Sequence, residues 1–89
     1  MKLKEGFRMR KLGRDHIVVG EGLKQVNFNK MIVLNETAAF LWERVSGKEF
    51  TKEELARLLT EKYDVSASVA AKDAADVADK WLEVGIAEE

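Results

Sequence analysis

The chain has 89 residues, enough for one domain with a single hydrophobic core, and we treat residues 1–89 as one unit. Because it contains no cysteine, disulfides and thiolate metal sites are excluded. No apolar run approaches the roughly 20 residues that a membrane-spanning helix needs. The N-terminus has no signal-peptide pattern, so we expect a cytoplasmic protein without membrane contacts.

The formal net charge of −1 conceals an uneven distribution. Residues 1–30 carry eight Lys or Arg against three Asp or Glu, whereas residues 31–89 carry seven against thirteen. This pattern is compatible with two ordinary solvated surfaces. The functional alternative is a polarised surface that orients a charged partner.

The first third of the chain predicts three short strands. Alternation over 7–12 and a β-branched run over 16–19 flank Gly13, which can take the positive φ of a hairpin turn. The segment 25–29 is ambiguous between a turn and a short strand. Residues 30–34 predict a third strand, because their centre is β-branched and an asparagine follows.

Beyond the third strand the hydrophobic period becomes helical. Asn35 is a suitable N-cap for a first helix, which Gly47 can end in the left-handed conformation. Thr51 and Glu54 form a capping box for a second helix. The Thr51 hydroxyl can accept a hydrogen bond from the amide of residue 54, and the Glu54 carboxylate can reach back to Thr51.

A third helix is predicted from Ala67 to Val84, with Ser66 or Ser68 as its N-cap and Gly85 at its end. Apolar residues repeat on one side of it and acidic residues occupy much of the rest. Three strands alone would leave an apolar sheet face in water, so the helices must cover it. The predicted fold class is α+β: three N-terminal β-strands followed by three α-helices, similar to a winged helix-turn-helix.

Few residues could perform chemistry. His16 is the only histidine and has no nucleophile beside it, so we interpret it as a surface or edge residue. The spacing of Asp73, Asp76 and Asp79 is more typical of a solvated helix face than of a metal site. No glycine pattern predicts a phosphate-binding loop. We therefore expect no enzyme activity, no metal and no cofactor.

A winged helix raises the alternative of nucleic-acid binding, which needs a basic recognition element. The predicted third helix instead carries two lysines against four acidic residues, which would repel a phosphate backbone. The first hairpin is basic but has no aromatic residue beyond Phe7 among its cations. We expect no nucleic-acid partner.

Several motifs in a fixed order carry a resemblance to one family. They are Leu34-Asn35-Glu36-Thr37-Ala38 with Leu41-Trp42 and Gly47, then Thr51, Glu54-Leu55, Leu58-Leu59 and Tyr63, and finally Asp73-Ala74, Val77-Ala78, Trp81 and Gly85-Ile86. Over about residues 7–87 the chain resembles the PqqD family, named for coenzyme PQQ synthesis protein D. It departs from the family pattern at Ala74, Val77 and Trp81, where larger or leucine residues are usual.

The resemblance implies a peptide-recognition domain, also called a RiPP recognition element. In such domains the leader segment of a ribosomally made precursor peptide adds as a strand beside the third strand and rests against the third helix. The domain then presents it to a radical-SAM or other modifying enzyme, as in PQQ biosynthesis. Strand addition is physically sensible, because an edge strand offers unpaired backbone groups.

The candidate peptide-binding residues lie on the predicted third strand and third helix: Met31, Ile32, Val33, Val69, Ala70, Asp73, Ala74 and Val77. Core packing is an equally good interpretation for Ile32, Ala74 and Val77. Met31 and Val33 are better candidates, because they point away from the face of Leu34.

Two further alternatives stay open. A protein-interaction module could have kept this fold without a leader-peptide role, and an exposed edge strand can also pair with a second copy to give a homodimer. Trp42 and Trp81 are assigned to the core in each case, because buried aromatic residues anchor small domains.

Overall fold

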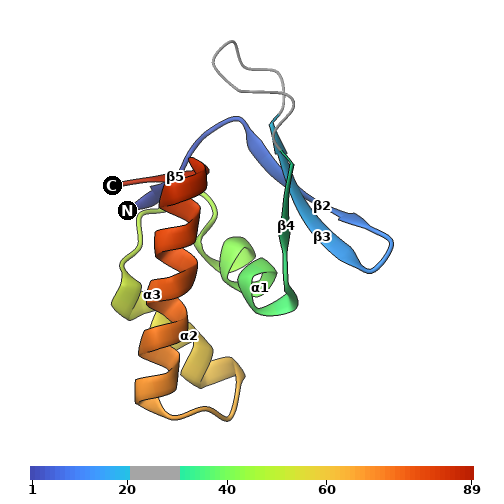
Figure 1. Cartoon of the computed structure of the whole chain (residues 1–89). Helices are drawn as coiled ribbons and strands as arrows, with labels where there is room; N and C mark the ends of the chain where they lie inside the picture. Colours follow the sequence, from blue (N-terminus) through green and yellow to red (C-terminus); the bar gives the residue numbers. More distant parts are fainter. Residues whose placement is uncertain (21–30) are drawn as a thin grey trace.

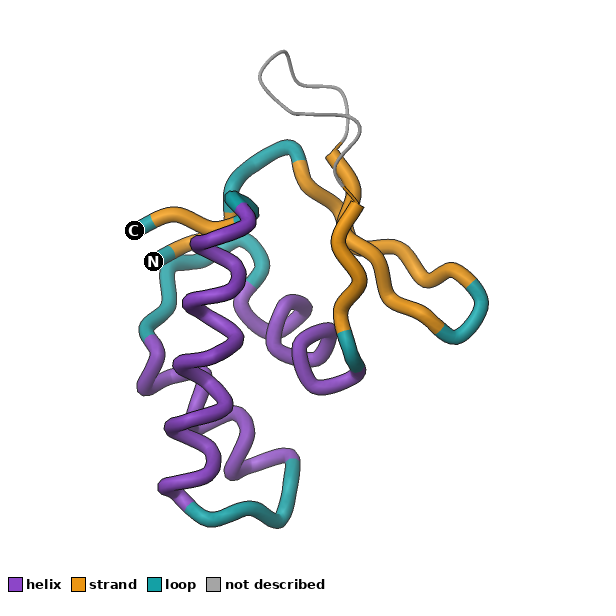
Figure 2. Tube along the Cα trace, in the orientation of Figure 1, coloured by secondary structure: helices purple, strands orange, loops and turns teal. Residues whose placement is uncertain are grey.

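A computed structural model describes residues 1–20 and 31–89, and of Met31 it describes the backbone alone. The segment 25–29, with its ambiguous prediction, lies outside these residues. The elements in chain order are β1 (Lys2–Leu3), β2 (Phe7–Leu12), β3 (Asp15–Gly20), β4 (Met31–Leu34), α1 (Glu36–Val45), α2 (Lys52–Lys62), α3 (Ala67–Val84) and β5 (Ala87–Glu88). The predicted α+β fold class is confirmed (Figures 1 and 2).

The main sheet is antiparallel, with the strand order β2-β3-β4. Gly13 has a φ of 64°, which allows the tight turn between β2 and β3. This hairpin extends away from the helices, and β4 runs down beside α1 (Figure 1). The central strand is β3, so the edge position considered for His16 is wrong, whereas its partial exposure agrees with the expected surface residue.

Alternation along β4 separates its side chains between the two faces of the sheet. Leu34 is buried at 6% exposure and Ile32 packs against the core, whereas Val33 between them is 61% exposed. The predicted assignment of Ile32 and Leu34 to one face is therefore confirmed. Successive residues of a strand point to opposite faces, which explains why a valine lies in solvent here.

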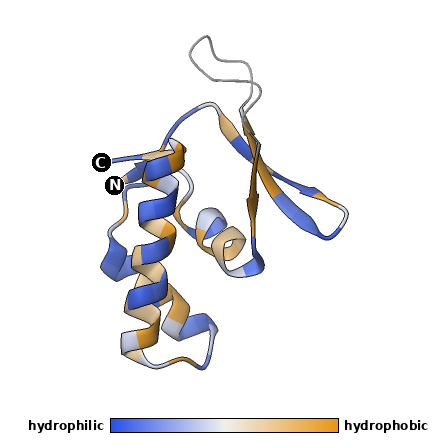
Figure 3. Ribbon diagram, viewed as in Figure 1, coloured by the Kyte–Doolittle hydropathy of each residue, from blue (hydrophilic) through white to orange (hydrophobic). Residues whose placement is uncertain are grey.

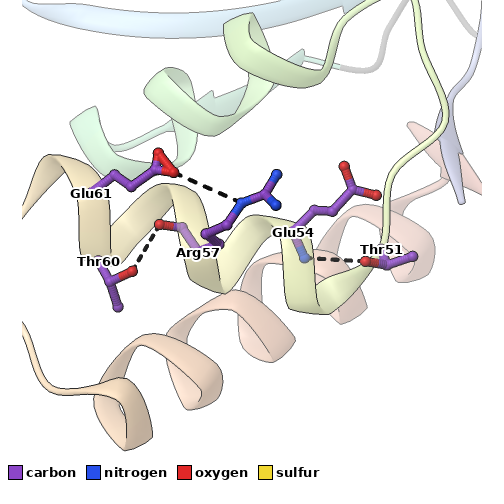
Figure 4. A network of polar contacts seen from close by, with 5 residues as sticks. All are labelled: Thr51, Glu54, Arg57, Thr60 and Glu61. Atoms are coloured by element: carbon purple, nitrogen blue, oxygen red, sulfur yellow. Dashed lines mark hydrogen bonds and ion pairs between the residues drawn. The ribbon is translucent and has the colours of Figure 1, made fainter.

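The helix starts follow the predicted caps. The Asn35 side chain accepts a hydrogen bond from the Ala38 amide at 2.8 Å, and Ser66, rather than Ser68, accepts from the Val69 amide at 3.2 Å. Thr51 accepts from the Glu54 amide at 3.1 Å, the first of the two bonds of the predicted capping box (Figure 4). These bonds satisfy amides that the first helical turn leaves without a carbonyl partner.

The centre of the core is an aromatic cluster on three elements. The ring of Trp81 in α3 meets that of Trp42 in α1 at 5.5 Å and that of Phe50, in the α1–α2 connection, at 6.1 Å, both edge to face. All three side chains are at most 5% exposed, so the assignment of Trp42 and Trp81 to the core is confirmed. Edge-to-face aromatic pairs add about 0.5–1.5 kcal/mol beyond their buried area.

A second, two-stranded sheet, which was not predicted, joins the two ends of the chain. β1 pairs antiparallel with β5, and the Lys4 amide donates to the Ile86 carbonyl at 3.0 Å. Ile86 and Ala87 of this segment are buried, and Gly85 turns the chain with a left-handed φ of 84°. Within the described residues no helix combines the length and apolarity needed to cross a membrane.

Shortening Trp81 tests the role of the aromatic cluster. Trp81→Ala should lower the free energy of unfolding by about 3–5 kcal/mol, because it removes two ring contacts and leaves a cavity. Urea denaturation followed by circular dichroism measures this loss. Leu12→Ala is the control: its side chain is 64% exposed, and a change within about 0.5 kcal/mol is expected. Similar losses in the two variants would contradict a central role for Trp81.

Placing the same charge on two neighbouring residues of β4 tests which face of the strand is buried. Val33→Asp should change the free energy of unfolding by less than about 1 kcal/mol, because the carboxylate stays in water. Ile32→Asp should cost at least about 2 kcal/mol, because its carboxylate faces the core. Thermal and urea melts of both variants measure the difference. The reverse order would mean that the strand is packed on its other face.

Candidate functional site

The free edge of β4 is the first feature that a ligand could use. Among the described strands, β4 pairs with β3 alone. In an antiparallel ladder both backbone groups of every second residue point toward the neighbouring strand, and those of the residues between point away. Half of the residues in β4 therefore offer an N–H and a C=O to a further strand.

The side chains of β4 make this edge apolar as well as open. Figure 3 shows β4 coloured as hydrophobic, whereas the neighbouring hairpin alternates with polar residues. The exposed Val33 provides an apolar contact on the outer sheet face, opposite the core. A strand added at this edge would place alternate side chains beside Val33 and the others toward the helices.

The α3 residues proposed for the site fall into two groups. The alanine stripe, made of Ala70, Ala74 and Ala78, has no exposed surface and packs in the core. Ala70 and Ala74 are therefore not available to a ligand in this structure, although both were predicted to line a groove. Small side chains let the backbones of packed helices approach closely, which accounts for three alanines at i+4 spacing.

The second group is at least partly exposed and lies on one side of the alanine stripe. We call it the valine–aspartate flank: Val69, 47% exposed, then the exposed Asp73, then the partly buried Val77. With about 100° between successive helical residues, these three form a row beside the stripe. On the other side of the stripe, Asp79 is reached by Lys52 of α2 at 2.8 Å, so α2 lies on that side.

The acidic residues of α3 differ in their partners. Asp76 is bound by Lys72 at 3.1 Å within the helix, and the Asp79 carboxylate accepts a hydrogen bond that raises the pKa of Lys52 above its ordinary value. Among the described residues Asp73 forms no such ion pair. Asp73 is thus the uncompensated charge at the centre of the valine–aspartate flank.

A cavity of about 750 Å³ lies elsewhere, between β1, the start of β2 and the end of α1. Its lining includes no residue of β4 or α3, and sequence reasoning did not predict it. Leu3, Phe7 and Trp42 are its apolar lining residues, and the remainder is mostly charged, with three lysines and three glutamates beside Ser46 and Gly47. The two-residue strands that form one side of it are too short to give a periodic signal, which is why it was missed.

Three hydroxyl side chains of the described residues form local hydrogen bonds. The Ser46 hydroxyl donates to the Trp42 carbonyl at 2.6 Å, Thr60 donates to the Arg57 carbonyl, and Thr51 caps α2 (Figure 4). No three His, Cys, Asp or Glu side chains of the described segments gather as a metal ion would require.

Comparison with known proteins agrees with this architecture. Among curated proteins no sequence matches the chain. The structure of lasso peptide synthetase B1 complexed with the leader peptide has a TM-score of 0.76 and 20% identity, covering 99% of this chain and 96% of that one. The structure of TbiB1 in complex with the TbiA(beta) leader peptide has a TM-score of 0.75 and 14% identity, covering 99% of this chain and 95% of that one. A family model described as coenzyme PQQ synthesis protein D matches residues 15–87, and the chain therefore belongs to the PqqD family.

Proposed function

We propose that this chain is a RiPP recognition element: it binds the leader segment of a ribosomally made precursor peptide by strand addition at β4. The observation that carries the proposal is the edge of β4, which pairs with β3 alone among the described strands and carries the 61%-exposed Val33. Both similar structures contain a leader peptide, which supports this choice among the ligands of an open edge. Membership of the PqqD family supports it further.

In this mechanism the backbone provides affinity and the side chains provide selectivity. The added strand forms ladder hydrogen bonds with the free groups of β4, which place little demand on the peptide sequence. Met31, Ile32 and Val33 provide this edge, and the valine–aspartate flank of α3 borders the peptide on its other side. Ala70 and Ala74 contribute through packing, since they are fully buried.

The proposed role is binding and presentation rather than catalysis. A domain that holds a peptide as an added strand leaves the rest of that peptide free, so a separate modifying enzyme, such as a radical-SAM enzyme, can act on it. Binding to nucleic acid is disfavoured, because the exposed side of α3 is predominantly acidic and a phosphate backbone is an anion.

The proposal is tested by an NMR amide-shift titration of the labelled protein with the leader segment of a precursor peptide encoded beside this chain. Shifts should concentrate on residues 31–34 and 69–77, with titration to millimolar peptide, where binding near about −4 kcal/mol is still detected. Strand addition also predicts slower exchange of the β4 amides that point to the free edge. Absence of shifts in both segments would contradict the proposal.

A charge at the edge should weaken binding without loss of the fold. Val33→Asp should raise the dissociation constant of the leader at least about tenfold, because it replaces an apolar contact by a carboxylate that loses water when the peptide strand covers it. Leu12→Asp is the matched control, since Leu12 is equally exposed at 64% but lies in β2, on the other edge of the sheet. Equal weakening by both substitutions would argue against a site at β4.

A further inference from the structure

The side chains of the valine–aspartate flank are apolar, acidic and apolar in order along α3: valine, aspartate and valine at positions 69, 73 and 77. Val69 is 47% exposed, Asp73 is exposed, and Val77 is partly buried against the core. The flank lies on the side of the alanine stripe away from the Lys52–Asp79 ion pair, so α2 does not cover it. A ligand that lies along the flank would meet Val69 and Asp73 on the exposed surface and Val77 at its partly buried end.

The charge of the flank is carried by its middle residue, Asp73. Asp76 and Asp79 are compensated by lysines of this chain, and among the described residues Asp73 has no ion-pair partner. An exposed carboxylate between two valines favours a ligand that brings a cation to that point and apolar groups on either side. Charge complementarity thus defines the chemistry of the occupant.

The spacing of the flank matches that of an extended peptide. Residues four apart on a helix are separated by about 6 Å along its axis, since each residue rises about 1.5 Å. Same-face residues of an extended strand, two apart, are separated by about 6.6–6.8 Å. Three consecutive same-face side chains of a strand can therefore meet Val69, Asp73 and Val77 one to one, with a mismatch of under about 2 Å over the row.

From this geometry we infer that the site selects extended peptides in which a basic residue is flanked, two positions away on each side, by apolar residues. The inference rests on the proposed strand addition at β4 and adds a sequence rule to it. The residues between these three point to the outer sheet face, beside Val33, and no charge requirement applies to them.

Three acetylated synthetic heptapeptides test the rule. The first, Ser-Val-Thr-Lys-Thr-Leu-Ser, has the inferred pattern. The second has glutamate in place of lysine, and the third, Ser-Val-Lys-Thr-Thr-Leu-Ser, keeps the composition but moves the lysine to the other face. NMR titration should show the first binding about two- to fivefold more tightly than each of the others, the range expected for one exposed ion pair.

Reversal of the charge on the protein gives an independent control. In Asp73→Lys the preference should invert in favour of the glutamate peptide, and it should fade in about 1 M salt, where the Debye length is about 3 Å. Glu83→Lys changes the net charge equally at a position about 15 Å further along the helix axis, and should leave the preference for lysine intact. Circular dichroism of both variants confirms that each is folded.

The outcomes separate this rule from the proposed function. If the leader segment shifts β4 amides but the heptapeptides bind equally, or if Glu83→Lys inverts the preference as Asp73→Lys does, the sequence rule is wrong and strand addition stands. If neither leader nor heptapeptides shift residues 31–34, the proposed function fails and the rule fails with it. Preference for the first heptapeptide, inverted in Asp73→Lys alone, supports both.

Discussion

The packing of Trp81 is the interaction on which the arrangement of the other elements depends. Its ring contacts Trp42 of α1 and Phe50 of the α1–α2 connection, so a single side chain of α3 fixes three parts of the chain. Further along the chain, Gly85 turns the backbone, and the Ile86 carbonyl accepts a hydrogen bond from the amide of Lys4 near the N-terminus. A small domain without disulfides gains its stability from such shared contacts, because its core contains few residues.

This packing covers one face of the β2-β3-β4 sheet and leaves the edge of β4 without a partner strand among the described residues. An open apolar edge is a liability, since it can pair with other chains and aggregate. Proteins usually protect such edges with charge, with bulges or by covering them. Val33 provides none of these, which is why we interpret the edge as a binding surface.

The two sides of α3 differ in exposure. The alanine stripe is fully buried, whereas Val69 and Asp73 of the neighbouring valine–aspartate flank are exposed. Lysines from α2 and from α3 itself pair with Asp79 and Asp76, and among the described residues Asp73 and Glu83 have no such ion pair. The boundary between buried and accessible side chains therefore runs along the length of one helix, between adjacent rows.

The three helices, their caps, the three strands of the main sheet and the buried face of β4 could be predicted from the sequence, because these depend on local periodicity and on hydrogen bonds within a few residues. The sequence did not predict β1 and β5, which are too short for periodicity and exist only because they pair across the chain. It also could not predict that Ala74 is fully buried whereas Asp73 is exposed, because burial depends on which elements pack against each side of α3.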